Sequence, residues 1–284
     1  MYEKTGLVLE GGGMRGSYTA GILDYFMEKG LMFSSVYGVS AGALIGANFL
    51  CQQHGRGFRT LTGYIGNKEY SGVGNLIKCG NWFDPDFSYR RIPYELDPAD
   101  FDTYAASPMK FYSVIANIET GQAEYHHIKD MRKEMDWLRA SASLPLLSQP
   151  VVLAGQKYLD GGISDSIPLQ RSMDDGNTKH VVILTQHRGF VKKPSSNKRL
   201  TRLIYRKYPN FIAAMENRHN MYNSQTELAY EMEKQGRAFV IQPENPVEIA
   251  RLEKDVSKLK TLYDIGYRQA ARIYDDLVAY LEKQ

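Results

Sequence analysis

The sequence predicts an α/β fold in which helices cover both faces of a mostly parallel sheet. Short apolar runs typical of strands alternate with segments whose apolar residues recur at helical spacing. The 284 residues are 43% hydrophobic and 24% charged, a balance typical of globular chains that bury a sizeable core. Few all-polar linkers separate the runs. We therefore expect one continuous fold.

The first fifty residues predict a β-α-β-α succession. Apolar residues from Ala20 to Met27 fall on one helical face, and short apolar runs flank this helix. The predicted strands are residues 6–10 and 34–38, and the predicted helices are residues 14–29 and 41–50.

The remaining elements follow from the same two patterns. The run 180–185 is strongly apolar and β-branched, so we expect a central strand there, and 238–241 is expected at an edge. Residues 119–122 are predicted to close a hairpin. The other predicted strands are 110–118, 123–127, 151–153 and 157–159, and the predicted helices are 167–173, 210–235 and 257–283.

Residues 38–42, GVSAG, fit the nucleophile elbow G-x-S-x-G. The motif lies between a predicted strand and a predicted helix, which is the context that the elbow requires. Gly38 and Gly42 permit a tight turn that strains Ser40, and the start of the following helix favours developing negative charge. Ser40 is therefore the candidate nucleophile. The alternative is a small-residue turn with a solvated serine.

A glycine-rich run, GGGMRG at 11–16, also joins a predicted strand to a predicted helix. Gly11, Gly12 and Gly13 can direct backbone N–H groups into one small volume, which suits an oxyanion hole. With Gly16 the run also matches the dinucleotide fingerprint G-x-G-x-x-G. That fingerprint expects an acidic residue about 20 positions later, at the end of the second strand. The serine motif occupies this place, which weakens the alternative of a dinucleotide-binding oxidoreductase.

Asp160 precedes Gly161 and Gly162 at the end of a predicted strand, and together with Ser40 it is the candidate general base. A turn aspartate is the alternative interpretation. His187 follows the strand 180–185, and the order Ser, Asp, His is that of the α/β-hydrolases. A Ser40–Asp160–His187 triad esterase therefore remains open.

These three motifs, in this order, resemble the bacterial patatin-like phospholipase family. The resemblance spans residues 6–168 and includes the small-residue block RASASLP at 139–145. It implies a three-layer α/β/α sandwich with a mostly parallel central sheet, extended here by C-terminal helices. It divides the chain into a patatin-like catalytic core at 1–187 and a basic segment with C-terminal helices at 188–284. We expect the second part to pack on the core and not to form an independent domain.

The resemblance also implies a Ser-Asp dyad that works without histidine. Ser40 attacks an acyl ester carbonyl, Asp160 accepts its proton, and the N–H groups of the glycine run, helped by Arg15, hold the oxyanion. Arg15 has an alternative role in packing or in pairing with Glu10, which stands where plant members carry aspartate. The glycines that support the motifs are Gly16, Gly38, Gly42, Gly161 and Gly162.

A basic segment at 188–207 carries eight Lys and Arg residues and no acidic residue. Bulky apolar residues are interleaved with the charges, a combination suited to docking on an anionic membrane. The candidates for this contact are Lys192, Lys193, Lys198 and Arg199. The alternative is a solvated basic loop. We expect no nucleic acid partner, because no recognised binding module accompanies the charges.

Composition and the lengths of apolar stretches indicate the cellular compartment of the protein. Two cysteines are too few for a disulfide framework or a cysteine-based zinc site, which favours a reducing compartment. No signal peptide is visible, and the longest nearly apolar stretch, 43–50, is far too short to span a bilayer. We expect a cytoplasmic enzyme, with peripheral contact at the inner face of the membrane, that hydrolyses phospholipids or other lipid esters without metal or organic cofactor. A catalytically silent lipid-binding module is the remaining alternative.

Overall fold

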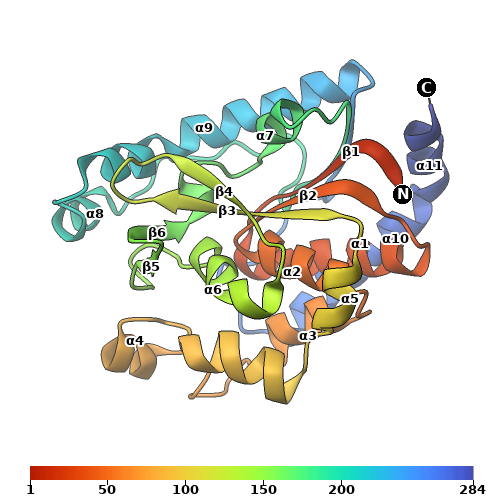
Figure 1. The fold of residues 1–284 in the computed structure, drawn as a ribbon. Helices are drawn as coiled ribbons and strands as arrows, with labels where there is room; N and C mark the ends of the chain where they lie inside the picture. The colour runs from red at the N-terminus through yellow and green to blue at the C-terminus, as the bar shows by residue number, and fades with distance from the viewer. Residues whose placement is uncertain (284) are drawn as a thin grey trace.

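A sheet of eight strands lies at the centre of the structure, a computed structural model that describes residues 1–283 (Figure 1). The strand order is β5-β6-β3-β2-β1-β7-β8, and β4 pairs with β3 outside this path. The strands are β1 (Tyr2–Leu9), β2 (Phe33–Val39), β3 (Lys110–Asn117), β4 (Ala123–His127), β5 (Val151–Leu153), β6 (Gln156–Asp160), β7 (Lys179–Ile183) and β8 (Ala238–Ile241).

The sheet is mixed but mostly parallel. Strands β3, β2, β1, β7 and β8 run parallel to their neighbours in this row, whereas β4, β5 and β6 pair in antiparallel fashion. The parallel strands are covered on both faces, which explains their continuous apolar sequences. Each predicted strand is present. As predicted, β7 is an interior strand and β8 lies at the edge.

Helices cover both faces of the sheet and make it the middle of three layers (Figure 1). The helices of the outer layers are α1 (Gly16–Glu28), α2 (Ala41–Leu50), α6 (Met131–Ser141), α7 (Leu169–Asp174), α9 (Pro209–Lys234), α10 (Val256–Arg272) and α11 (Tyr274–Glu282). Side chains of β1 point alternately to the two faces of the sheet: Leu7 and Leu9 pack with α1, α2 and α10, whereas Val8 packs with α7 and α9. No helix within residues 1–283 is both long and apolar enough to cross a membrane.

The last predicted helix, 257–283, is wrong in one respect, since the structure divides it into α10 and α11. The break is at Ile273, whose φ of −93° and ψ of 4° are not helical. The change of direction carries α11 to the edge of the sheet. There the Tyr280 hydroxyl accepts a hydrogen bond from the N–H of His180 in β7, at 3.0 Å.

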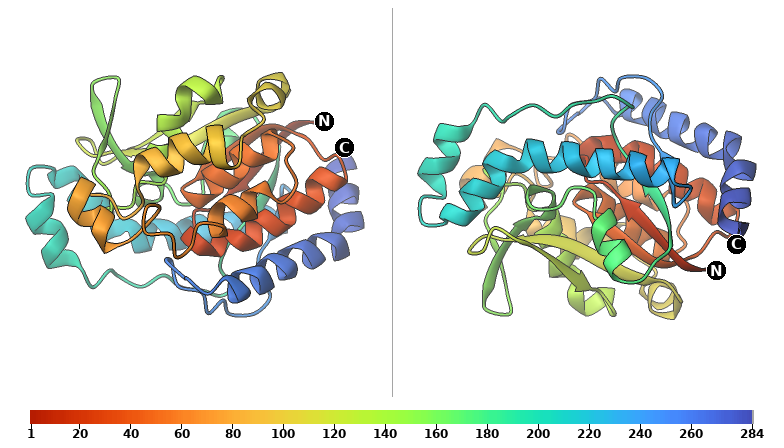
Figure 2. Two further views of the ribbon diagram at one scale, coloured as in Figure 1. Left: turned by 90° about the horizontal axis from the view of Figure 1, so that it is seen from below. Right: turned by 90° about the horizontal axis from the view of Figure 1, so that it is seen from above.

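The stretch 51–109, in which no element was predicted, forms a helical cover beside α2. In the view from below in Figure 2 this cover lies nearest the viewer. Its elements are α3 (Arg56–Thr62), α4 (Val73–Cys79), the π-helical segment η2 (Phe87–Leu96) and α5 (Phe101–Ala106). The cover contributes no strand to the sheet.

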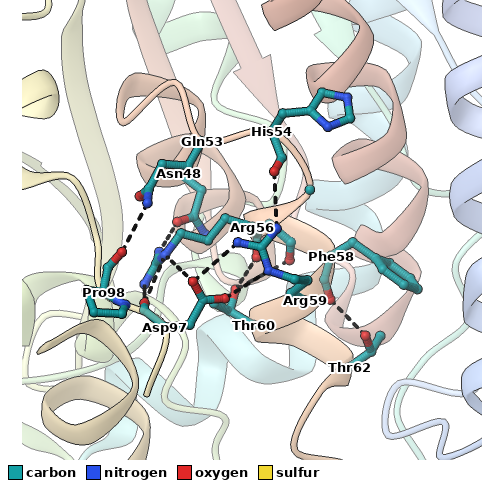
Figure 3. Close-up of polar contacts among 12 residues, drawn as sticks. Asn48, Gln53, His54, Arg56, Phe58, Arg59, Thr60, Thr62, Asp97 and Pro98 are labelled. Carbon is teal, nitrogen blue, oxygen red and sulfur yellow. Dashed lines mark hydrogen bonds and ion pairs between the residues drawn. The ribbon is translucent and has the colours of Figure 1, made fainter. Parts of the chain in front are cut away.

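One polar cluster holds both ends of this cover together (Figure 3). Arg56, at the start of α3, donates to the backbone oxygen of Asp97 through Nε and Nη2, at 3.1 and 2.6 Å. Arg59 binds the Asp97 carboxylate at 3.1 Å. Arg56 also contacts the side chain of Asn48 in α2. The buried Arg56 is therefore compensated by Asp97, and the two ends of the cover are fixed against α2.

Candidate active site

Two strands that end against β3 bring Ser40 and Asp160 together. Strand β2 pairs with β3 as far as Val39 opposite Val114, and β6 pairs with β3 from Asp160 opposite Ile115. Strand β4 occupies the other edge of β3 along this stretch, so β2 and β6 lie on the same edge and end head to head. The sheet register thereby joins two residues that are 120 positions apart in the sequence.

Ser40 and Asp160 form a direct hydrogen bond. The Ser40 Oγ donates to Oδ2 of Asp160 at 2.7 Å, and the other carboxylate oxygen, Oδ1, accepts from the N–H of Gly162 at 2.8 Å. Ser40 is 7% exposed and Asp160 3%. Burial raises the pKa of Asp160, although the hydrogen bond from Ser40 and the charge of Arg218 oppose this effect. The carboxylate is thus both oriented and made more basic.

The turn that carries Ser40 has the strain of a nucleophile elbow. Its φ is 55° and its ψ is −125°, a backbone conformation that non-glycine residues rarely adopt. The Ser40 N–H donates to Ser141 Oγ at 2.9 Å, which helps to hold the turn. Gly38 lies in β2, one residue before the strand ends, and Gly42 lies in the first turn of α2. A Cβ at Gly42 would lie 2.6 Å from the carbonyl oxygen of Leu9, so only glycine fits there.

The glycine-rich loop lies directly against Ser40. A Cβ added to Gly11 would be 2.9 Å from the Cβ of Ser40, so the backbone of the loop takes the space of a side chain. The N–H groups of Gly11, Gly12 and Gly13 donate to no acceptor within residues 1–283. Free N–H groups beside a nucleophile are the donors that an oxyanion hole requires. Gly16 follows this loop as the first residue of α1.

Arg15 lies in the short 3-10 helix η1 (Gly13–Arg15) and has few polar partners. Its Nη1 reaches the carbonyl of Ile249 at 3.5 Å, and its buried Nε has no partner in the described part of the chain. Arg15 and Glu10 do not form the alternative ion pair, because no nitrogen of Arg15 lies within 4.0 Å of a carboxylate oxygen of Glu10. Glu10 instead accepts the N–H of Thr185 at 2.6 Å.

The family assignment follows from the order and content of these segments. A model of the patatin-like phospholipase family matches residues 7–172, more than half of the chain. The chain belongs to the patatin-like phospholipase family. A second family model, described as a domain of unknown function (DUF6363), matches residues 208–282, which include α9, β8, α10 and α11.

Individual relatives cover different shares of this patatin-like chain. "Uncharacterized protein YjjU" of Escherichia coli is 29% identical over 266 residues, which are 92% of this chain and 74% of that protein. "Lysophospholipase nte1" of Aspergillus niger is 30% identical over 175 residues, 58% of this chain but only 11% of that protein. Among solved structures, VipD from Legionella pneumophila superposes with a TM-score of 0.46 at 15% identity, covering 96% of this chain and 67% of that one.

No histidine takes part in the Ser40–Asp160 pair of this family member. His187 makes no hydrogen bond to either residue; its buried Nδ1 is unpartnered within residues 1–283, and its ring packs on Phe190. The triad alternative therefore lacks its third contact. The other five histidines contact residues elsewhere: His54 with Glu28, His126 with Glu134, His127 with Tyr112, His180 with Ser172 and His219 with Glu216.

A cavity of about 140 Å³ runs beside Ser40 between α2, the helical cover and α6. Its walls are mostly apolar, and its lining includes Ser40 and also Asn48 and Arg56. Asn48 follows Ser40 by eight residues in α2, so it lies about 12 Å further along the helix axis. This cavity could not be predicted from the sequence, because much of its wall belongs to the unpredicted cover.

The basic segment is less uniform in the structure than in the sequence. Lys193, Lys198 and Arg199 are exposed, but Lys192 turns inward, with its Nζ 4.0 Å from the centre of the Tyr222 ring. The Lys192 N–H also donates to Asn223 in α9 at 2.9 Å. Lys192 therefore differs from the other three docking candidates.

Two further cations of this segment form ion pairs with acidic residues of α9. Arg188 pairs with Glu233 at 2.5 Å and Arg202 pairs with Glu216 at 2.6 Å, partners that the local sequence could not reveal. The short helix α8 (Lys198–Ile204) exposes an apolar surface next to the remaining charges. Its exposed apolar residues are Leu200, Leu203 and Ile204.

Proposed function

We propose that this protein is a serine acyl hydrolase that acts on phospholipids or other lipid esters, of the phospholipase A or lysophospholipase type. The observation that carries the proposal is the 2.7 Å hydrogen bond from Ser40 Oγ to the buried Asp160 carboxylate, in a strained turn beside an apolar cavity. Membership of a family described as phospholipases and relatives named lysophospholipases support the substrate class.

In the first half of the reaction, Ser40 Oγ attacks the ester carbonyl carbon while Asp160 takes the hydroxyl proton. The oxygen of the carbonyl becomes an oxyanion, and the free N–H groups of Gly11, Gly12 and Gly13 are the donors proposed to stabilise it, since Gly11 lies directly against Ser40. The intermediate collapses when Asp160 returns the proton to the leaving alcohol. The acyl group then remains on Ser40 as an ester.

In the second half, water attacks the acyl-enzyme. Asp160 takes a proton from the water, the oxyanion forms again in the same place, and collapse expels the serine oxygen, which regains the proton. The products are the fatty acid and the free enzyme. The apolar cavity that includes Ser40 in its lining supplies a place for the acyl chain throughout both halves.

The proposal is tested with intact lipids. Purified protein is incubated with a mixture of phospholipids, lysophospholipids and acylglycerols, and the products are followed by mass spectrometry. Release of fatty acid from at least one class by the wild type, and from none by Ser40→Ala, is the expected result. Nucleotide binding without any ester turnover would instead favour the oxidoreductase alternative.

We also propose that residues 188–284 do not form an independent domain from the core at 1–187. Strand β8 extends the sheet by pairing with β7, and α10 packs along α1. The Arg218 guanidinium of α9 donates to the carbonyl of Gly162, next to Asp160. The C-terminal part therefore contributes both to the core and to the immediate surroundings of the dyad.

Activity is expected to depend on pH through Asp160. Asp160 accepts a proton only when ionised, so kcat/KM rises with pH through its folded-state pKa, and burial places that pKa above the usual range of an aspartate. The raised pKa also means that the protonated form stabilises the fold at low pH, a contribution lost as the pH rises through the folded-state pKa. The measurement is the pH profile of kcat/KM on an uncharged soluble ester. An acid limb in the usual aspartate range, or one that disappears in His187→Ala, would refute this expectation.

We propose that the exposed part of the basic segment docks on anionic membrane. Lys193, Lys198 and Arg199 lie beside the exposed apolar side chains of α8, and each cation near an anionic surface contributes about 1 kcal/mol. Changing these three residues to glutamate is expected to weaken binding to vesicles rich in anionic lipid by several kcal/mol, and wild-type binding should fade as salt rises. Co-sedimentation at two salt concentrations measures both effects.

The matched control reverses three exposed cations outside the basic segment, Lys4, Lys110 and Lys129. This variant has the same net charge as the docking variant, so it should retain vesicle binding if the position of the charges matters. Hydrolysis of a short soluble ester should be unchanged in both variants. Equal loss of vesicle binding in the two, or loss of soluble-ester activity together with binding, would overturn the docking proposal.

A further inference from the structure

Four cationic side chains gather near the Ser40–Asp160 pair without a carboxylate partner of their own. We call them the cationic cluster; they come from η1, the loop after β7, α9 and the loop before α10. Its members are Arg15, Lys192, Arg218 and Arg251. No ion pair within 4.0 Å involves any of the four in the described part of the chain, whereas ten other arginines each have an acidic partner.

Arg218 and Lys192 form the side of the cluster next to Asp160. Arg218 Nε donates to the carbonyl of Gly162, whose own N–H donates to Asp160. The Nη2 of Arg218 lies 3.3 Å from the point where a Cβ on Gly162 would be. Tyr222 is one helical turn after Arg218 on the same face of α9, and Lys192 Nζ lies over its ring. These contacts place Lys192 beside Arg218.

Arg251 and Arg15 form the side next to the glycine-rich loop. The carbonyl of Arg251 accepts the N–H of Met14 at 3.1 Å, and its Cγ lies 2.7 Å from the position of a Cβ on Gly13. Arg251 also lines the cavity that includes Ser40. Arg15 Nη1 donates to the carbonyl of Ile249, in the loop that carries Arg251, at 3.5 Å. The buried Nε of Arg15 has no partner in residues 1–283.

The charge around the dyad is therefore unbalanced. The acids near the four cations are Glu10 and Asp160, and no residue that lines the cavity carries a carboxylate. Burial and the neighbouring arginines lower the pKa of Lys192 to about 7 and that of Arg218 to about 10, the response of cations that lack counter-charge. Arg15, Lys192 and Arg218 are partly buried, whereas Arg251 is exposed. Partly buried cations without partners are costly unless an anion compensates them. These uncompensated cations lie at the place where a substrate would bind.

We propose that the cationic cluster is a subsite for the phosphate group of the substrate, so that the enzyme prefers acyl esters that carry a phosphate close to the scissile bond. This inference rests on the proposed function, since it names the substrate class of the same site. Guanidinium groups match the geometry of phosphate oxygens and bind them through paired hydrogen bonds. The acyl chain occupies the apolar cavity, and Arg251, which borders that cavity together with Ser40, meets the headgroup.

The subsite is tested by binding, separately from catalysis. Isothermal titration calorimetry on the Ser40→Ala protein compares a decyl glyceryl ether with its phosphate monoester, neither of which can be hydrolysed. The phosphate monoester is expected to bind at least about tenfold more tightly, the magnitude of one or two hydrogen bonds to a charged group. Adding Arg251→Gln or Lys192→Gln should remove most of this preference. Arg268→Gln, which removes an exposed arginine of α10 that forms no ion pair within residues 1–283, is the matched control and should leave it intact.

Three outcomes would overturn the subsite. Equal affinity for the two ethers would show that the cationic cluster does not bind the phosphate group. Equal loss of affinity for both ethers in the Arg251 and Lys192 variants would show a general structural defect. Inorganic phosphate that binds as tightly as the ether phosphate would assign the cluster to free phosphate and not to a lipid headgroup.

Kinetics on matched substrates separates this proposal from the proposed function. With lysophosphatidic acid and a monoacylglycerol of the same chain, the wild type should favour the phosphate-bearing ester, and Arg251→Gln should raise KM for that ester about 10- to 100-fold with little change for the other. Hydrolysis of both esters without preference would contradict the subsite alone. Hydrolysis of no ester would contradict the proposed function, whereas the calorimetric comparison would still decide the subsite.

Discussion

Ser40→Ala is expected to reduce ester hydrolysis by several orders of magnitude and to leave the fold intact. The nucleophile is lost, and removal of one member of a catalytic unit typically costs about as much as removal of all of them. The hydroxyl makes one side-chain hydrogen bond, to Asp160, so its removal leaves the packing of the sheet and helices unchanged. Initial rates on a chromogenic short-chain ester, with circular dichroism of both proteins, measure the two effects.

The matched control for this experiment is Ser196→Ala, which removes the hydroxyl of an exposed serine in the loop before α8. It should hydrolyse the soluble ester at the wild-type rate. If Ser40→Ala keeps more than about a hundredth of the wild-type rate while folded, Ser40 is not the nucleophile, because residual catalysis without one is far smaller.

Asp160→Asn is expected to be nearly as damaging, with a loss on the order of 10⁴ in kcat. The amide has almost the same shape and its oxygen can still accept the N–H of Gly162, but it cannot take the proton of Ser40. His187→Ala should have little effect, because His187 contacts neither member of the pair. The two variants are compared on the same soluble ester and at the same pH.

The comparison distinguishes a dyad from a triad. A loss on the order of 10⁴ in His187→Ala would move the assignment to the Ser-Asp-His arrangement, since members of one catalytic unit fail together. Near wild-type activity in Asp160→Asn would remove Asp160 from the role of general base and leave its bond to Ser40 a structural one.

Local sequence patterns located the elements that carry the motifs. The helix predicted at 41–50 and the strand predicted at 123–127 have the observed bounds, because each is fixed by its own apolar pattern and by adjacent turn residues. The same holds for Ser40, whose elbow depends on neighbours within five residues. That Asp160 lies at 2.7 Å from Ser40 depends instead on the register of β2 and β6 against β3. The motif at 160–162 made Asp160 a candidate base and the family resemblance implied the dyad, but the register that brings the two residues together depends on all three strands.

Features that depend on distant partners were not predictable in this way. The cover at 51–109 has no motif, and its short helices are held by contacts such as Arg56 with Asp97. Arg218 lies in a predicted helix and Arg251 in a segment without a predicted element, and neither belongs to a motif that would place it at the dyad. The acids that pair with Arg202 and Arg188 come from α9, so these ion pairs could not be predicted from the basic segment alone. The inward turn of Lys192 onto Tyr222 is likewise a tertiary effect.

The site at which a fluorophosphonate modifies the protein identifies the nucleophile. The reagent phosphonylates an activated serine and mimics the tetrahedral intermediate, so digestion and mass spectrometry of the treated protein identify the nucleophile without any assumption about the lipid substrate. We predict a single adduct on the peptide that contains Ser40, formed much more slowly in Asp160→Asn and at the wild-type rate in His187→Ala. An adduct on another residue, or none on a folded protein, would show that Ser40 is not the nucleophile.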